Sequence, residues 1–124
     1  MKQLQSQARA KYAYECISFV LANKGLDQKS IRSYVQSLPA MIQTNGFGQA
    51  LAFYLANKKS SGEYKKIYEW VQEWLRLQNI YPGDKLLMAC IAEGSMHQYQ
   101  LATAETQALL VWLKKFARAE LESS

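Results

Sequence analysis

The chain has 124 residues, 49% of them hydrophobic and 20% charged, which is typical of one globular domain and excludes a disordered or fibrous protein. Fifteen Lys and Arg residues against ten Asp and Glu residues give a formal net charge of +5, which favours anionic partners without identifying one. The N-terminus lacks the apolar core of a signal peptide, and no apolar run is long enough to span a membrane. We therefore expect a single cytoplasmic domain, residues 1–124, without membrane association.

The pattern of apolar residues predicts an all-α fold, a single compact helical bundle of about six helices. Apolar residues recur with helical spacing, prolines occur only at 39 and 82, and no hairpin turn joins alternating segments. The expected helices cover residues 3–23, 28–44, 46–58, 61–78, 84–93 and 96–119. The second is expected to bend or break near Pro39, because a proline ring disfavours helical geometry in the residue before it.

Polar residues that cap helices mark several of the predicted helix starts. A short polar side chain before a helix accepts a bond from a free backbone N–H, and a Glu or Gln three residues later can return the bond. The predicted caps are Asp27 for the second helix, Ser60 with Glu63 for the fourth, Asp84 for the fifth, and Ser95 with Gln98 for the sixth.

Two glycines, Gly46 and Gly48, stand at the start of the third predicted helix. Backbone N–H groups at such a position can bind a phosphate. However, no Gly-Lys-Ser/Thr sequence follows, no strand precedes, and Gln49 is the only polar side chain nearby. We interpret Gly46 as a left-handed helix end and Gly48 as a close approach of a neighbouring backbone. The helix is then expected to be the central, buried one.

Residue types suited to catalysis or metal binding are sparse. Cys16 and Cys90 lie far apart inside apolar helical patterns, and His97 is the only histidine, so a structural zinc site is not expected. Both cysteines are interpreted as small buried apolar groups. His97 falls in the first turn of the sixth helix, where no second catalytic group accompanies it. No active site, metal or cofactor is predicted.

Three residues are candidates for contacts with a protein partner. Glu105 lies in the apolar face of the sixth helix, beside Leu101 and Leu109. It is either satisfied inside the domain, by an arginine or a helix terminus, or it forms an ion pair with a partner. Trp70 and Leu77 flank the apolar stripe of the fourth helix, so we expect both to be exposed for contact with a neighbouring subunit.

The basic residues fall into three clusters, which are Arg9 with Lys11, the segment from Lys58 to Lys66, and Lys114 with Lys115 and Arg118. A solvated helix face, with cations placed near a helix C-terminus, explains them without a ligand. Phosphate binding is the alternative, although no motif for reading bases appears. The sequence alone leaves both open.

Several segments together resemble a known protein family. They are "QARAKYAYE", "LPAMIQTNGFGQALAFYLANK" and "ATAETQALLVWLKKFARAEL". The most distinctive is L-P-x-M-I-x-x-N-G-x-G-Q-A-L-A-F, from Leu38 to Phe53, supported by W-L-K-K-F-A from Trp112 to Ala117. In this order, over almost the whole chain, they resemble the small helical subunit of the Cmr (type III-B CRISPR-associated) effector complex. Phe47 departs from the family, where an aliphatic residue is expected.

The resemblance implies a non-catalytic protein that is present in several copies in a ribonucleoprotein. In that family, small subunits line up along the backbone subunits that carry the guide RNA, the target RNA passes between the two rows, and other subunits cleave it. With such a role in view, our hypothesis is that the basic cluster of Lys114, Lys115 and Arg118 faces RNA, with Arg9 and Lys11 as second choices and Lys58, Lys59, Lys65 and Lys66 as a weaker patch. Expected partners are other Cmr subunits, further copies of the chain and the guide–target RNA duplex.

Two other classes of function stay open from the sequence. A free-standing helical adaptor would use the same apolar patches without RNA, and a small enzyme would need a pocket around His97 or Gly46. The isolated protein is expected to be monomeric.

Overall fold

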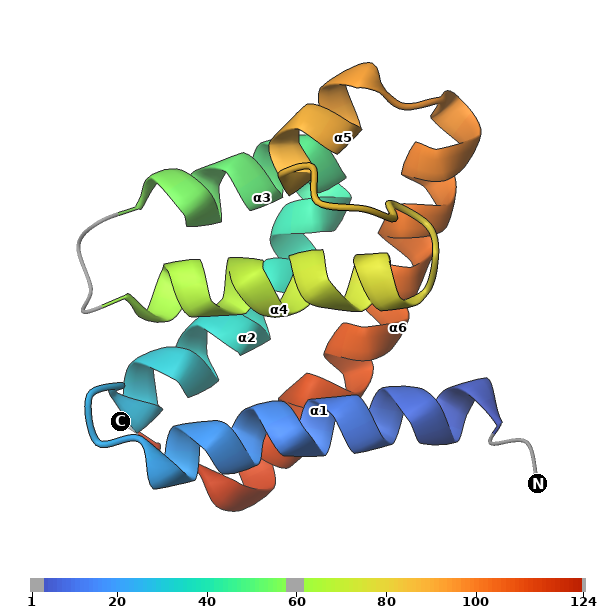
Figure 1. The fold of residues 1–124 in the computed structure, drawn as a ribbon. Coiled ribbons are helices and arrows are strands. Elements are labelled where there is room, and N and C mark those ends of the chain that lie inside the picture. Colours follow the sequence, from blue (N-terminus) through green and yellow to red (C-terminus); the bar gives the residue numbers. More distant parts are fainter. Residues whose placement is uncertain (1–3, 58–61, 124) are drawn as a thin grey trace.

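The structure, a computed structural model, describes residues 4–57 and 62–123. These residues form six α-helices and contain no strand, which confirms the predicted all-α fold (Figure 1). The helices are α1 (Gln5–Ala22), α2 (Gln28–Asn45), α3 (Phe47–Ala56), α4 (Glu63–Leu77), α5 (Leu87–Glu93) and α6 (Met96–Glu120).

The longest helix, α6, organises the bundle. It packs against α1 on one side and α2 on another, while α3 and α4 pack on α2 and on each other (Figure 1). The short helix α5 lies at one end, close to α3. Helices α1 and α4 cross the same side of the molecule, so that a groove forms between them.

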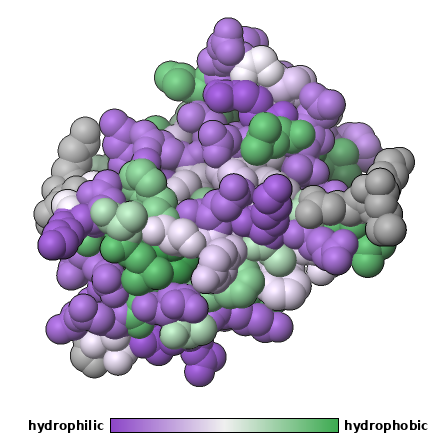
Figure 2. All heavy atoms as spheres, turned by 60° about the horizontal axis from the view of Figure 1, so that its bottom comes forward, coloured by the Kyte–Doolittle hydropathy of each residue, from purple (hydrophilic) through white to green (hydrophobic). Residues whose placement is uncertain are grey.

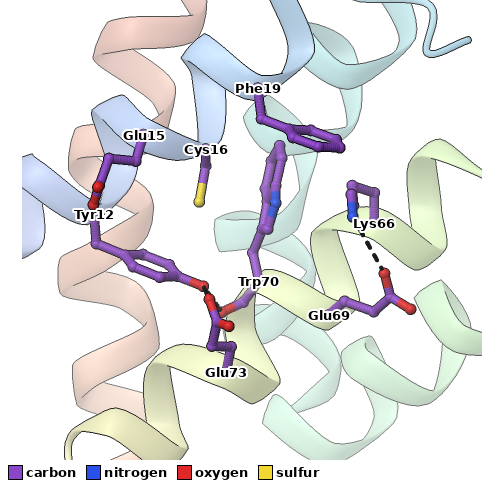
Figure 3. A pocket seen from close by; sticks show the side chains of 8 residues that line it. All are labelled: Tyr12, Glu15, Cys16, Phe19, Lys66, Glu69, Trp70 and Glu73. Atoms are coloured by element: carbon purple, nitrogen blue, oxygen red, sulfur yellow. Dashed lines mark hydrogen bonds and ion pairs between the residues drawn. The ribbon is translucent and has the colours of Figure 1, made fainter. Parts of the chain in front are cut away.

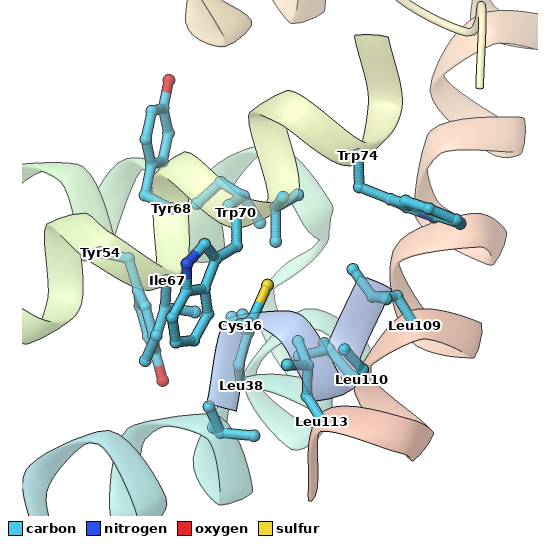
Figure 4. Packing of buried hydrophobic residues seen from close by; sticks show 14 of the residues in the cluster. Cys16, Leu38, Tyr54, Ile67, Tyr68, Trp70, Trp74, Leu109, Leu110 and Leu113 are labelled. Atoms are coloured by element: carbon cyan, nitrogen blue, oxygen red, sulfur yellow. The ribbon is translucent and has the colours of Figure 1, made fainter. Parts of the chain in front are cut away.

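One hydrophobic core joins these helices, because each helix turns an apolar stripe inward. In α4 the buried residues at helical spacing include Ile67, Val71 and Trp74, and they belong to the same cluster as Leu109 and Leu113 of α6, part of which Figure 4 shows. All five are at most 3% exposed. Burying one such aliphatic side chain contributes about 1.5–3 kcal/mol relative to leaving it in water, so the core holds the helix faces in fixed positions.

Two of the predicted caps are confirmed. The Asp27 carboxylate accepts a hydrogen bond from the backbone N–H of Ser30 at 3.1 Å. At the start of α6, Ser95 Oγ accepts from the N–H of Gln98 at 3.1 Å, and the Gln98 side chain accepts from the N–H of Ser95 at 3.0 Å. The polar residues that precede these helices therefore fix where they begin.

The starts of α4 and α5 differ from the prediction. Ser60 lies outside the described residues, and the Glu63 carboxylate accepts from the backbone N–H of Asp27 at 2.8 Å, which ties the start of α4 to the start of α2. The predicted Asp84 cap is wrong, because α5 begins only at Leu87. Gln72 of α4 accepts from the N–H of Leu87 at 2.7 Å, so a neighbouring helix supplies the cap.

Of the two outcomes predicted at Pro39, a break or a bend, the break does not occur. Helix α2 continues through Pro39 to Asn45, although proline contributes no N–H to the helix. The neighbouring Leu38 is fully buried, and the Pro39 carbonyl accepts a hydrogen bond from Gln107 of α6 at 3.0 Å. Packing against α6 outweighs the local preference of the proline.

The glycine pair has two separate roles. Gly46, with φ of +90°, separates α2 from α3 in a conformation that favours glycine. The expectation of a close backbone at Gly48 is wrong, because a Cβ there would meet the Ile91 side chain at 3.4 Å. Helix α3 is also not the central buried helix, since Phe53 and Leu55 are 47% and 37% exposed. The neighbouring helices therefore cover only part of the apolar surface of α3.

Candidate nucleic-acid interface

A groove between α2 and α6 gathers the principal basic cluster of the sequence. We call it the basic groove; it has a volume of about 410 Å³. It is lined by Pro39 and Gln43 of α2 and by Gln107, Val111, Lys114, Lys115 and Arg118 of α6. None of these residues is acidic, so the groove presents an uncompensated positive charge.

Hydrogen bonds between the helices position the walls of the basic groove. At one end Gln107 binds the carbonyl of Pro39, and at the other the Arg32 guanidinium donates to the carbonyl of Leu121 at 3.4 Å. The N–H of Glu122 also donates to the side chain of Gln28 at 3.1 Å. The N-terminal part of α2 therefore lies beside the C-terminal end of α6, and the two helices run antiparallel.

The three basic residues of α6 share the groove because of their spacing. Lys114 and Arg118 are four residues apart, which places them on one face of a helix. Lys115 follows on the adjacent side, and its ammonium lies 5.5 Å from the centre of the Trp112 ring. Lys115 and Arg118 are exposed and Lys114 is half-buried. Long cationic side chains placed in this way can reach a phosphate backbone while their stems cover apolar surface.

Two further cations extend the basic surface and were not among the predicted site residues. Lys29 and Arg32 line an adjoining depression of α2, and Arg118 lines both depressions. None of the described residues that line the second depression is acidic either. In the sequence these two residues lie about 80 positions from Lys114, so only the packing of α2 on α6 brings them together. In the sequence, only the spacing of three residues between Lys29 and Arg32 within one predicted helix could have indicated that they share a face.

Arg9, a second choice for RNA contact, is bound within the chain. Its Nε and Nη2 atoms donate to the two carboxylate oxygens of Glu105 at 2.6 and 3.0 Å. Trp74 Nε1 donates to the same carboxylate at 3.0 Å. Arg9 and Lys11 of α1 do not line the basic groove, although Lys11 is exposed. Arg9 is therefore a weaker candidate than the cations of α6.

The same contacts decide between the two interpretations of Glu105. Burial alone would raise the pKa of Glu105, but hydrogen bonds from Arg9 and Trp74 outweigh it and hold the pKa below its ordinary value. The bond to Glu105 raises the pKa of Arg9 in turn. The structure supplies the internal arginine that the first interpretation required, and nothing in this geometry supports a partner-facing Glu105.

The expected exposure of Trp70 is wrong and that of Leu77 is right. The Trp70 side chain is only 7% exposed and packs between α4 and α1 (Figure 4). Leu77, in contrast, is 60% exposed. Helix α4 is covered by α1 as well as by α2 and α3, so its buried stripe is wider than helical periodicity suggests. Trp70 belongs to the core, and a partner contact at Leu77 stays a prediction.

The remaining predicted residues are the lysines near the start of α4 and His97. Lys58 and Lys59 lie outside the described residues, Lys65 is exposed, and Lys66 lies over the ring of Phe19 at 4.6 Å. His97 is exposed at the start of α6.

Cys16 and Cys90 are free and buried, as expected. Within residues 4–57 and 62–123, no three His, Cys, Asp or Glu side chains are grouped where they could hold a metal. No helix in this part of the chain has the length and apolar character needed to cross a membrane.

Comparisons with known proteins agree with this fold. A family model described as "CRISPR-associated protein (Cas_Cmr5)" matches residues 5–120. The chain is 29% identical over 118 residues to the CRISPR system Cmr subunit Cmr5 of Thermus thermophilus, covering 95% of this chain and 96% of that protein. It is also similar to the crystal structure of a CRISPR-associated Cmr5 family protein from Thermus thermophilus. That likeness has a TM-score of 0.78 and 26% identity, and it covers 98% of this chain and 100% of the other.

Proposed function

The chain belongs to the Cas_Cmr5 family of CRISPR-associated proteins, and from this membership we propose that it is a non-catalytic small subunit of a type III-B Cmr ribonucleoprotein. Within that assembly its basic groove contacts the target RNA. The complex cleaves invading RNA in the cytoplasm, and this subunit acts as a structural unit of a filament. The cleavage chemistry belongs to other subunits.

The observation that carries the RNA contact is the convergence of five cations on one face. Lys114, Lys115 and Arg118 line the basic groove, and Arg118 joins it to the depression that holds Lys29 and Arg32. Contacts to phosphates position a nucleic acid without reading its sequence. A subunit that must accept any target RNA needs this kind of contact and no base-reading motif.

The fold supports the structural part of the proposal. A continuous core holds all six helices, so the basic face has a fixed shape to present to a long partner. The proposed protein partners are the backbone subunit that carries the guide RNA and further copies of this chain. Exposed Leu77, at the end of α4, is a proposed contact with one of these neighbours.

The RNA contact is tested by reversing two charges in the groove. In the assembled complex, Lys114→Glu with Arg118→Glu should weaken target-RNA binding and flatten its salt dependence. Each lost phosphate contact reduces the slope of log K against log salt by roughly 0.7 to 0.9, so a decrease of about 1.4 to 1.8 is expected. The matched control is Lys24→Glu with Lys85→Glu, which changes the net charge equally at exposed positions outside both depressions.

The outcomes separate the two parts of the proposal. Normal assembly with weakened RNA binding in the groove variant alone supports both. Normal assembly with equal RNA binding in both variants would remove the RNA contact and leave only a subunit that binds protein. A chain that never assembles with guide RNA would instead favour the free-standing helical adaptor.

A further inference from the structure

A second groove, on the face formed by α1 and α4, differs in chemistry from the basic groove. It has a volume of about 420 Å³ and is lined by Tyr12, Glu15, Cys16, Phe19, Lys66, Glu69, Trp70 and Glu73 (Figure 3). We call it the α1–α4 groove. The Trp70 ring rises from α4 between the two helices, next to Phe19 of α1. Aromatic side chains thus form its base, and carboxylates stand along its sides.

The charge of the α1–α4 groove opposes that of the whole chain. Glu15, Glu69 and Glu73 contribute three negative charges and Lys66 one positive charge, which leaves minus two in a protein whose formal net charge is +5. All three glutamates are exposed. The field at this groove therefore attracts cations and repels a phosphate backbone.

Hydrogen bonds hold part of this arrangement in place. The Tyr12 hydroxyl donates to the Glu73 carboxylate at 2.7 Å and lies 3.1 Å from the carbonyl oxygen of Trp70. Burial, together with the nearby Cys16 and Glu73, raises the pKa of Tyr12, so the hydroxyl remains a donor. The Glu73 carboxylate is therefore already held at the side of the groove. Its side chain loses little further conformational freedom when a cation binds.

Lys66 already shows how the groove holds a cation. Its ammonium lies 4.6 Å from the centre of the Phe19 ring and 3.7 Å from a carboxylate oxygen of Glu69 (Figure 3). A cation over an aromatic face and beside a carboxylate gains from both contacts. Phe19 is still 43% exposed. Figure 3 shows Glu15 and Glu73 on the other side of the groove from Lys66, with the Tyr12 ring beside them, so carboxylates and an aromatic ring are available there to a second cation.

We propose that the α1–α4 groove is a docking site for an arginine- or lysine-bearing segment of a partner protein. The cation lies between Glu15 and Glu73, and the stem of its side chain packs against the aromatic base. An arginine suits the site best, because its planar group stacks on aromatic rings and binds carboxylates through two donors. This inference does not depend on RNA binding at the basic groove.

A purely apolar partner fits this face less well. In Figure 2, which turns the α1 side forward, hydrophobic side chains form separate patches between hydrophilic ones. Recognition by charge and by stacking, at one defined groove, agrees better with such a surface than broad apolar contact does. The two grooves therefore give the subunit one side for a polyanion and another for a cationic protein segment.

A peptide titration of the full chain tests the docking site. The probe is an acetylated, amidated peptide of alternating arginines and alanines, and its control carries citrulline at every arginine. Binding is followed by NMR through the backbone amides of α1 and α4 and the indole N–H of Trp70, which a Trp70→Phe variant identifies. We expect the arginine peptide to shift these signals and the citrulline peptide to leave them unchanged.

A pair of triple variants separates the groove from overall charge. Glu15→Gln, Glu69→Gln and Glu73→Gln together should weaken peptide binding about tenfold, because three partly screened attractions are lost. Glu93→Gln, Glu120→Gln and Glu122→Gln change the net charge equally at exposed carboxylates outside the groove, and should have a much smaller effect.

Three results would overturn the proposal. They are equal weakening by the two triple variants, no shift in α1 or α4 with the arginine peptide at millimolar concentration, and a shift of the same signals by a short RNA in place of the peptide.

Discussion

Arg9 and Glu105 connect α1 to α6 through two hydrogen bonds, 2.6 and 3.0 Å long, between the guanidinium and the carboxylate. The pair is partly shielded from water, with side chains 24% and 13% exposed. Trp74 of α4 binds the same carboxylate, so one acidic group joins three helices. Such charge-assisted bonds in a shielded site are stronger than surface ion pairs.

Removing the charge of Glu105 should destabilise the fold. For Glu105→Gln we expect the free energy of unfolding at neutral pH to fall by about 1–3 kcal/mol, because Arg9 loses its charged acceptor. Urea denaturation measures this change. Glu93→Gln is the control, since Glu93 also forms an ion pair, with Lys85 at 2.7 Å, but at a site where both side chains are at least 60% exposed. Equal losses in the two variants would contradict the special role of Glu105.

The contribution of Glu105 should depend on pH. Its folded-state pKa lies below the ordinary value of 4.5, so its stabilisation is complete above that value and is lost as the pH falls through the folded-state pKa. The difference in unfolding free energy between the native chain and Glu105→Gln should therefore stay constant from neutral pH down to about 4.5, and it should shrink over the acidic range below that value. A difference that stays constant over this range would show that Glu105 acts without its charge.

The two glycines before and within α3 should respond differently to alanine. Gly46→Ala should cost about 1–3 kcal/mol of stability, because only glycine adopts its backbone conformation without strain. Gly48→Ala should change stability by less than about 1 kcal/mol, since a Cβ there meets Ile91 at ordinary contact distance and alanine favours the helix. Thermal unfolding of the two variants compares them directly. Similar losses would mean that both positions require glycine.

Trp70 and Leu77, which were predicted to behave alike, should differ. Trp70→Ala should destabilise the fold by about 3–5 kcal/mol because it leaves a cavity between α1 and α4. Leu77→Ser should alter stability by no more than about 0.5 kcal/mol and impair assembly if Leu77 contacts a neighbour. Denaturation measures the first effect and co-purification of other subunits the second. Normal assembly of Leu77→Ser would remove Leu77 from the interface.

Cys16 should be unreactive in the folded protein. Burial raises the pKa of its thiol to about 12, and the side chain is only 5% exposed. In a Cys90→Ser variant, the native chain should react with a disulfide reagent at pH 8 at least about a hundredfold more slowly than the denatured chain, because the thiolate is the attacking species. Rates within about tenfold of each other would show that the α1–α4 groove opens readily.

Local sequence signals predicted the helices well and their surroundings poorly. Helical spacing and the caps at Asp27 and Ser95 depend on neighbours within one turn, so the sequence contains all the necessary information. The start of α5 depends on Gln72 of another helix, and the burial of Trp70 depends on α1 lying across α4. Neither contact can be derived from a local pattern.

In the candidate site, too, local spacing was predictable from the sequence and contacts between helices were not. The spacing of Lys114, Lys115 and Arg118 within one helix predicts a shared face, and the structure places all three in one groove. The addition of Lys29 and Arg32 required the antiparallel packing of α2 on α6. The pairing of Arg9 with Glu105, 96 positions apart, likewise makes Arg9 a weaker candidate for RNA contact, and only the tertiary structure reveals this pairing.

The most direct test of the proposed function is to purify the tagged chain from its own host at moderate salt, then to sequence the RNA and identify the proteins that accompany it. Our account predicts short guide RNAs together with the other Cmr subunits, and an RNA content that survives in the Lys24→Glu, Lys85→Glu control. A pure chain, with neither guide RNA nor Cmr subunits, would contradict it.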